Sequence, residues 1–124
     1  WILGQVMYDG KKVMDEQIDA YYSRMLTPNA LFAQIALCRA IDFDVLEKYV
    51  NRLTEIDRET LIIWGENDEW IPVKFAYKFH EMLTRSSLAV IPHCGHIPQE
   101  EKPEIVFTLI DDFIKGVRLN SNGG

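Results

Sequence analysis

Two polar side chains that could cooperate in acid–base catalysis each follow an apolar run of the sequence. Asp68 comes shortly after the run 60–64, and His96 comes shortly after the run 88–91. A carboxylate that accepts a hydrogen bond from imidazole Nδ1 fixes the tautomer of the ring and leaves Nε2 free to act as a general base. The two residues would thus be the acid and the histidine of a catalytic triad. We expect a carboxylate oxygen of Asp68 to lie about 2.6–3.2 Å from Nδ1 of His96.

The two apolar runs are the elements that must position these side chains. Both are short and lack polar alternation, which is typical of strands buried on both faces of a parallel sheet. Pro72 opens a helical segment between them, and Pro103 opens another after the second run. This strand–helix–strand–helix order predicts parallel strands, whose carboxyl ends share one edge of the sheet and bind ligands there. Two such strands do not complete a sheet, and Trp1 stands in place of an initiator Met, so the sequence predicts part of a longer protein.

The first half of the sequence is expected to be helical. Apolar residues recur at helical spacing from Asp15, the expected N-cap, and a second helix is expected over 28–40 with Thr27 as its cap. A third helix is expected from Asp44, and the segment 2–7 is the strand candidate of this half. The apolar stripe of the first helix, which we expect to pack in the core, comprises Ile18, Tyr21, Tyr22, Met25 and Leu26.

Composition excludes several classes of protein. The chain has 124 residues, 48% of them hydrophobic and 26% charged, which is typical of a globular domain. A formal net charge of −6 with dispersed acidic residues argues against nucleic-acid binding. The apolar runs are too short to cross a bilayer, and no secretion signal opens the chain. Cys38 and Cys94 form no disulfide framework and suit a reducing compartment, so we expect a cytoplasmic protein without membrane contact.

Two segments resemble a known family. The segment 61–72, LIIWGENDEWIP, looks like the strand and acid loop of α/β hydrolases, and the segment 94–103, CGHIPQEEKP, is similar to the histidine loop of the same family. The resemblance implies an α/β fold: the C-terminal part of an α/β hydrolase, with two parallel strands and flanking helices. It implies a helical cap or lid over 1–53, a C-terminal portion of the hydrolase core over 54–118 and a flexible tail over 119–124.

The resemblance also implies a function. The family's nucleophile lies earlier in the chain, in a G-x-S-x-G turn that this sequence does not contain. The implied protein is a serine-type, esterase-like hydrolase of a small ester or similar acyl substrate, with Asp68 and His96 as catalytic residues. Its N-terminal hydrolase half would be a partner of this chain, which alone would be inactive. Neither a cofactor nor a metal is implied. Trp70 and Ile97 adjoin the two catalytic residues and would line the substrate pocket, unless they serve ordinary core packing.

The identity of the acid and a possible metal site stay open from the sequence. Glu66 lies nearer the strand end than Asp68 and is a rival acid, and Asp68 could instead cap the following helix. The residues His93, Cys94 and His96 include candidate metal ligands, but their close spacing gives poor tetrahedral geometry, and Cys94 is more readily explained as a packing residue.

The roles of two glutamates and the class of protein stay open as well. Glu100 and Glu101 could begin the last helix, stabilise the histidine loop or face solvent. An aspartate nucleophile, as in dehalogenases and epoxide hydrolases of this fold, is not distinguished from a serine. The chain could also be a non-catalytic binding module derived from the hydrolase fold.

Overall fold

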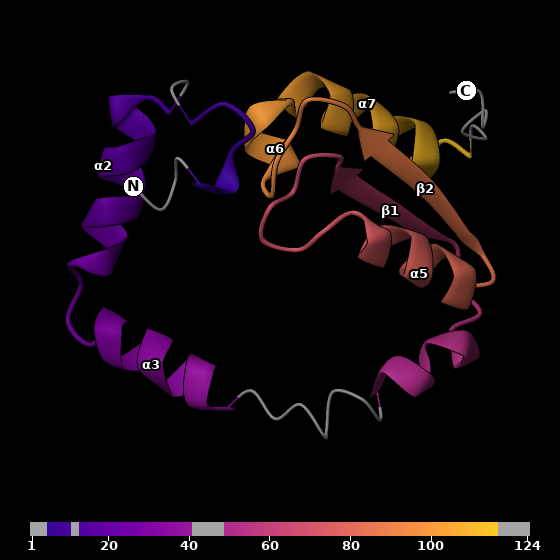
Figure 1. Cartoon of the computed structure of the whole chain (residues 1–124), viewed down its shortest axis with the longest axis horizontal. Coiled ribbons are helices and arrows are strands. Elements are labelled where there is room, and N and C mark those ends of the chain that lie inside the picture. The colour runs from indigo at the N-terminus through magenta and orange to yellow at the C-terminus, as the bar shows by residue number, and fades with distance from the viewer. Residues whose placement is uncertain (1–4, 11–12, 41–48, 117–124) are drawn as a thin grey trace.

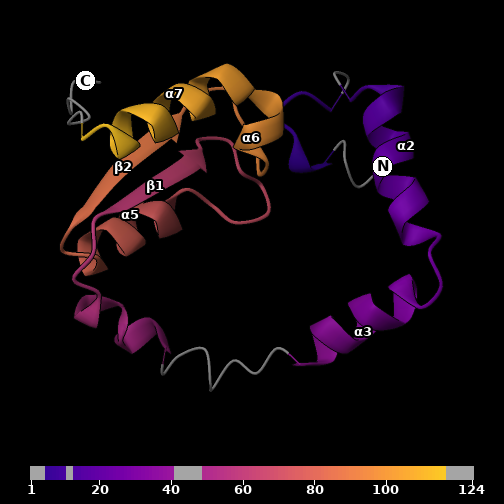
Figure 2. The ribbon, with the colours of Figure 1, turned by 180° about the vertical axis from the view of Figure 1, so that it is seen from behind.

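The computed structural model describes residues 5–10, 13–40 and 49–116. A two-stranded sheet and its helices make up the second half, and two helices extend away from them in the first half (Figures 1 and 2). In chain order the elements are α2 (Asp15–Met25), α3 (Ala30–Ala40), the 3₁₀ turn η2 (Leu53–Glu55), β1 (Thr60–Gly65), α5 (Lys74–Met82), β2 (Ser86–Ile91), α6 (Pro98–Glu101) and α7 (Pro103–Ile114).

The sheet is parallel, as the sequence predicts. β1 and β2 pair directly, in a register that runs from Thr60 opposite Ser86 to Gly65 opposite Ile91. The two strands therefore end at the same level, and the loops that follow them open at the same edge of the sheet. This arrangement brings the loop that carries Asp68 beside the loop that carries His96.

Helices cover both faces of this sheet. On one face Ile62 of β1 packs against Ala76 and Leu83 at α5, and Trp64 and Phe79 join this cluster. On the other face Ile91 of β2 packs with Cys94 and Val106, the latter from α7; Ile63 and Leu109 extend that cluster. Successive β1 side chains thus serve opposite faces, as expected of a strand that is buried on both sides. In Figure 1 the sheet lies between α5 and α7.

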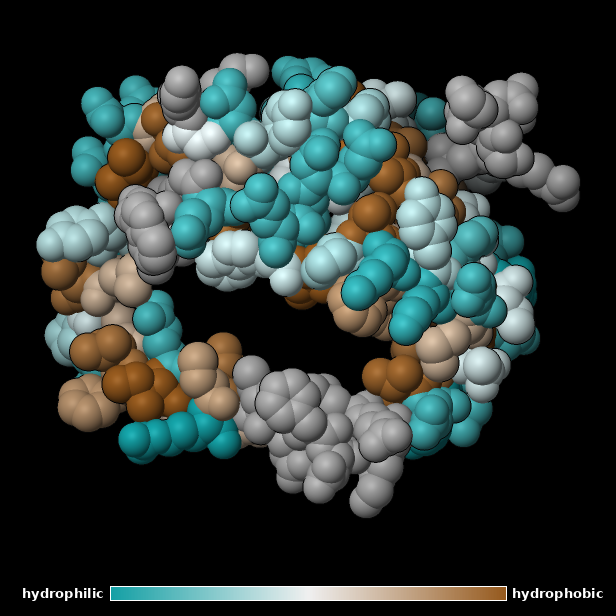
Figure 3. Space-filling view, in the orientation of Figure 1, coloured by the Kyte–Doolittle hydropathy of each residue, from teal (hydrophilic) through white to brown (hydrophobic). Residues whose placement is uncertain are grey.

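The helices α2 and α3 contain no buried residue, so the predicted core position of the first apolar stripe is wrong for this structure. Tyr22 is 60% exposed on α2, and Phe32 is 74% exposed on α3. The physical reason is that the described elements cover little of α2 and α3, although the Tyr21 hydroxyl contacts Glu100 of α6. Figure 3 accordingly shows apolar side chains gathered on the surface of the arm that α3 forms.

Several predicted boundaries differ from the structure. Gln5 and Val6 are helical and not extended, which corrects the strand prediction for 2–7 as far as that segment is described. The N-cap of α2 is Met14 and not Asp15. The side chain of Gln17 accepts the Met14 N–H at 3.1 Å, so the helix begins one residue earlier than predicted.

The second and third predicted helices differ as well. α3 begins two residues after Pro28, and the Thr27 hydroxyl donates to the Arg24 carbonyl and does not cap α3. The start of the predicted third helix at Asp44 lies outside the described residues, although 49–51 are helical. The predicted tail, 119–124, also lies outside them. Among the helices that the structure describes, none is long and apolar enough to cross a membrane.

Candidate active site

The loop after β1 holds the carboxylate of Asp68 in a fixed orientation. Oδ1 accepts the backbone N–H groups of Trp70 at 2.9 Å and Ile71 at 2.8 Å. The Trp64 indole N–H donates to the Ile71 carbonyl at 3.0 Å, so the end of this loop is hydrogen-bonded to β1. The side chain of Asp68 is only 4% exposed. With Oδ1 occupied by the loop itself, Oδ2 is the oxygen that remains to receive a partner.

That partner is His96, from the loop after β2. Its Nδ1 lies 2.9 Å from Oδ2 of Asp68, within the range expected from the sequence, so the predicted contact is confirmed. A carboxylate only accepts hydrogen bonds, so this geometry puts the ring proton on Nδ1 and leaves the lone pair on Nε2. The His96 side chain keeps 29% of its surface exposed. The ring is therefore oriented on one side and accessible on the other.

Backbone hydrogen bonds join the two loops to each other. The Asn67 N–H donates to the Cys94 carbonyl at 2.9 Å, and the Glu66 N–H donates to the Ile91 carbonyl at 2.9 Å. The His96 N–H donates to the Val6 carbonyl at 2.6 Å, so the first described segment also contacts the histidine loop. These bonds fix the relative position of the two loops independently of the Asp68–His96 contact.

The two adjacent glutamates of α6 have different contacts. The carboxylate of Glu101 accepts the backbone N–H of Gly95 at 2.7 Å and that of Tyr8 at 2.9 Å. Glu100 instead faces α2, where it accepts hydrogen bonds from the Tyr21 hydroxyl and from Nε2 of Gln17. Glu101 therefore stabilises the histidine loop, one of the possibilities left open from the sequence, whereas Glu100 contacts α2.

The carboxylate that contacts the histidine is that of Asp68, whose Oδ2 lies 2.9 Å from Nδ1 of His96, whereas Glu66, the rival acid, is exposed. The part of the chain that the structure describes contains no group of three or more His, Cys, Asp or Glu side chains arranged to hold a metal ion. Cys94 is fully buried, and its desolvation together with the charge of Glu101 raises the pKa of the thiol to about 11. A thiol in that environment is a packing group, as expected.

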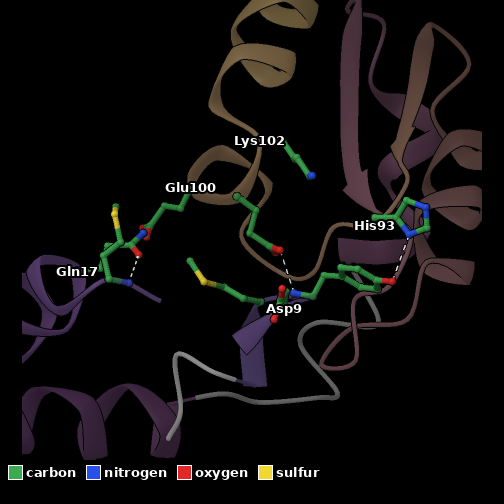
Figure 4. A pocket seen from close by; sticks show the side chains of 9 residues that line it. Asp9, Gln17, His93, Glu100 and Lys102 are labelled. Atoms are coloured by element: carbon green, nitrogen blue, oxygen red, sulfur yellow. Dashed lines mark hydrogen bonds between the residues drawn. The ribbon is translucent and has the colours of Figure 1, made fainter. Parts of the chain in front are cut away.

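The predicted pocket residues stay a prediction. The Trp70 ring lies beside the His96 ring, with centroids 5.5 Å apart, and Ile97 is half-buried next to it. Figure 4 shows a cavity of about 180 Å³, and neither Trp70 nor Ile97 is among the residues that line it. Its lining includes Met7, Tyr8, Asp9, Met14, Gln17, His93, Glu100, Glu101 and Lys102. Because His93 and not His96 borders this cavity, it is separate from the Asp68–His96 pair.

The contacts of Glu101 and the tight backbone approach of the two loops are features that the sequence alone does not predict. A signal for the close approach exists in the two glycines, Gly65 at the end of β1 and Gly95 before His96. Glycine at such positions permits a backbone contact that any side chain would obstruct. No comparable signal separates Glu101 from Glu100.

The known proteins that the chain resembles are hydrolases. The chain is 31% identical over 110 residues to the uncharacterized hydrolase YugF of Bacillus subtilis (strain 168), covering 89% of this chain and 39% of that protein. It is 31% identical over 97 residues to the 2-hydroxy-6-oxo-6-(2'-aminophenyl)hexa-2,4-dienoic acid hydrolase of Metapseudomonas resinovorans, covering 77% of this chain and 33% of that protein. No family model matches the chain.

The crystal structure of a serine hydrolase involved in carbazole degradation, the CarC enzyme, superposes with a TM-score of 0.81 at 26% identity, covering 92% of this chain and 45% of that one. The chain thus spans about two fifths of the length of the hydrolases it matches. Parallel strands with helices on both faces and polar loops at the strand ends agree with that likeness. The chain belongs to the α/β hydrolases and corresponds to the C-terminal part of their fold.

Proposed function

We propose that Asp68 and His96 are the acid and the general base of a catalytic triad, in a hydrolase whose nucleophile lies outside this chain. The observation that carries the proposal is the 2.9 Å contact between Nδ1 of His96 and Oδ2 of Asp68, with Oδ1 held by two backbone N–H groups. A carboxylate restrained in this way orients the imidazole without further rearrangement. The relatives, which are hydrolases, support the same assignment.

The proposed chemistry is hydrolysis of a small ester or a similar acyl compound in two steps. A nucleophile oxygen attacks the acyl carbon while Nε2 of His96 accepts its proton, and Nε2 then returns that proton to the departing alcohol. Water, deprotonated by Nε2, next attacks the acyl-enzyme; the bond to the nucleophile breaks, Nε2 returns the proton to the nucleophile oxygen, and the acid is released. Asp68 stays ionised throughout and stabilises the imidazolium that forms twice in the cycle. An aspartate nucleophile would alter the first step but leave His96 to activate the water.

The names of several relatives favour a second class of substrate, the 2-hydroxy-6-oxo dienoic acids. Such compounds carry a ketone carbonyl, which the nucleophile would attack while Nε2 of His96 accepts its proton. The carbon–carbon bond beside that carbonyl would then break, and the departing carbon, in place of an alcohol oxygen, would take up the proton. A short-chain aryl ester and 2-hydroxy-6-oxohepta-2,4-dienoate, assayed side by side, would separate the two substrate classes.

The partner in this proposal is an N-terminal hydrolase portion that carries the nucleophile. Two findings support it: the chain spans about two fifths of its relatives, and large apolar side chains of α2 and α3 are exposed. The coding sequence upstream of Trp1 provides a direct check. A nucleophile turn found there supports the proposal, and a reading frame that starts near residue 1 favours the non-catalytic binding module.

The experiment that tests the proposed roles uses a protein in which this chain is joined to such an N-terminal portion. Asp68→Asn should lower kcat by up to about 10⁴-fold, because the amide favours the wrong imidazole tautomer. His96→Ala should lower it at least as much, because it removes the proton acceptor. Thermal melts would show that both variants remain folded. Near-native turnover of His96→Ala would overturn the proposed function.

A further inference from the structure

One carboxylate joins three segments of the chain around the histidine loop. Glu101, at the end of α6, accepts the N–H of Gly95 at 2.7 Å and the N–H of Tyr8 at 2.9 Å. Tyr8 belongs to the first described segment, far from α6 in the sequence. Hydrogen bonds from N–H groups to an ionised acceptor are roughly twice as strong as those between neutral groups. The side chain of Glu101 therefore holds two backbone segments that are not otherwise bonded to α6 by regular structure.

These hydrogen bonds hold Gly95, the residue that precedes His96. The His96 N–H donates to the Val6 carbonyl at 2.6 Å. Val6 and Tyr8 lie in the same segment, so the bonds of Glu101 and of His96 form a closed set around positions 95 and 96. A shift of Tyr8 or Gly95 would be passed to the backbone of His96, and from there to the ring that meets Asp68.

The packing at Gly95 leaves little room for such a shift. A Cβ at this position would lie 2.4 Å from the Val6 carbonyl oxygen, 2.8 Å from Oε1 of Glu101 and 2.8 Å from the Tyr8 nitrogen. Gly95 is buried, and Cys94 beside it is fully buried. The contact is thus a close-packed junction in which the Glu101 carboxylate accepts a hydrogen bond from the backbone of residue 8 and another from that of residue 95.

We infer that Glu101 is a positioning residue for the reaction: its carboxylate fixes the Gly95 backbone so that His96 faces both Asp68 and the reacting atoms. The inference rests on the proposed function. Glu101 does not contact the imidazole itself, so its effect passes through the loop backbone. A misplacement of about 1 Å in a catalytic group costs on the order of 10²-fold in rate, so loss of this anchor should be visible in kcat.

The test compares three variants in the joined protein, with a short-chain aryl ester as substrate. Glu101→Ala removes both acceptors, and Glu101→Gln keeps the shape and one acceptor oxygen. Glu104→Gln is the matched control, because Glu104 is exposed in the first turn of α7 and carries the same charge. We expect Glu101→Ala to lower kcat by about 10- to 100-fold with KM changed less than about twofold, Glu101→Gln to lose only a few-fold, and Glu104→Gln to match the wild type.

A second measurement does not depend on turnover. In ¹⁵N-labelled protein, the amide proton of Gly95 should move upfield in Glu101→Gln, because its charged acceptor becomes a neutral one, and should stay in place in Glu104→Gln. If Glu101→Ala does not fold, the kcat of Glu101→Gln and this shift decide the question. An unchanged kcat together with an unchanged amide shift would then overturn the inference.

The outcomes separate this inference from the proposed function. If Asp68→Asn and His96→Ala abolish turnover while Glu101→Ala matches Glu104→Gln, the positioning role is wrong and the triad roles stand. A loss in Glu101→Ala that appears only in KM would also overturn the positioning role. If Asp68→Asn and His96→Ala both keep turnover, the proposed function fails, and the inference fails with it.

Discussion

The backbone of Gly65 lies directly against the carbonyl of Gly95. A Cβ at position 65 would be 2.0 Å from the Gly95 oxygen and 2.5 Å from the Cys94 oxygen, distances that no real Cβ adopts. Gly65 is the last residue of β1, and Gly95 precedes His96. The distance between Asp68 and His96 is therefore set at the base of their loops by backbone contact, in addition to the hydrogen bond between the side chains.

Gly65→Ala should consequently disturb the site through sterics alone. Both obstructing atoms belong to the backbone, so the histidine loop has to move away from the strand end. We expect the free energy of unfolding to fall by about 1–3 kcal/mol, the usual range for overpacking. In the joined protein kcat should fall as well. Urea unfolding and turnover, measured on the same preparation, would check both effects.

Gly116→Ala provides a control with a different cause. Gly116 has φ of +72° and nothing within 4 Å of a built Cβ, so its substitution costs conformational energy without a clash. That cost is roughly 1–2 kcal/mol for an L-residue in the left-handed region. Its kcat should stay at the wild-type level. Equal loss of kcat in both variants would mean that general destabilisation, and not the contact between loops, explains the effect of Gly65→Ala.

The sheet and the Asp68–His96 contact are predictable from the sequence because local patterns determine them. Continuous apolar runs identify strands buried on both faces, and parallel strands that end together place their following loops at one edge. The contacts of Glu101 are not predictable in this way. They depend on where Tyr8 lies relative to Gly95, which is a tertiary approach between segments far apart in sequence.

In the helical first half, the sequence predicts the helices but not their burial. The apolar spacing over α2 and α3 correctly predicts helices, because a period near 3.6 is a local property. Burial is not local, and Tyr22, which belongs to the stripe expected in the core, is 60% exposed in the structure. Which surface covers a stripe depends on other parts of a protein, and a single stripe cannot identify them.

Glu66→Gln tests the choice of acid. Glu66 is exposed and makes its described bond through the backbone, whereas Asp68 is buried and bonded to the imidazole. The variant should keep kcat within a few-fold of the wild type, against a loss of up to about 10⁴-fold for Asp68→Asn. Both would be assayed on one aryl ester with melts recorded. A larger loss in Glu66→Gln than in Asp68→Asn, at equal stability, would identify Glu66 as the acid.

A titration tests the contact between α2 and α6. The hydrogen bond to Glu100 raises the pKa of the Tyr21 phenol, because ionisation would break that bond and place a phenolate beside a carboxylate. Absorbance at 295 nm, taken as the difference between wild type and Tyr21→Phe, isolates this group. Its midpoint should fall in Glu100→Gln and stay constant in Glu104→Gln. An unchanged midpoint in Glu100→Gln would show that the contact does not form in solution.

Alkylation of the two cysteines tests the packing around the histidine loop. Cys94 is buried with a pKa raised to about 11, whereas Cys38 is exposed. Only the thiolate reacts with iodoacetamide, and at pH 9 roughly one Cys94 thiol in a hundred would be ionised even if it were accessible. Peptide mass mapping should therefore find Cys38 modified and Cys94 unmodified until urea is added. Equal labelling without urea would contradict the buried junction.

The same pKa shift has a consequence for stability. The folded chain keeps the Cys94 proton to higher pH than the unfolded chain, whose thiol titrates near its ordinary value of about 8.5. The contribution of the protonated Cys94 thiol to the free energy of unfolding is thus complete below the pKa of the unfolded chain, and it is lost as pH rises towards about 11. The urea midpoint should fall more steeply over this interval in the wild type than in Cys94→Ala. Parallel pH profiles for the two proteins would contradict the shift.

The chain by itself should show no serine-hydrolase turnover above that of an Asp68→Asn, His96→Ala double variant. The sequence contains no G-x-S-x-G turn, so an activated nucleophile is absent although the proposed base and acid are present. Ser86 is the serine whose surroundings most resemble those of a nucleophile, because its Oγ lies 2.8 Å from Nδ1 of His80. That hydroxyl also donates to the Leu83 carbonyl at 2.7 Å, so its proton is directed away from the histidine. A fluorophosphonate probe should accordingly leave Ser86 unlabelled, while it labels the nucleophile of the joined protein in the same experiment. Stoichiometric labelling of any serine in this chain would contradict the prediction, whether or not the Ser86→Ala variant loses that label.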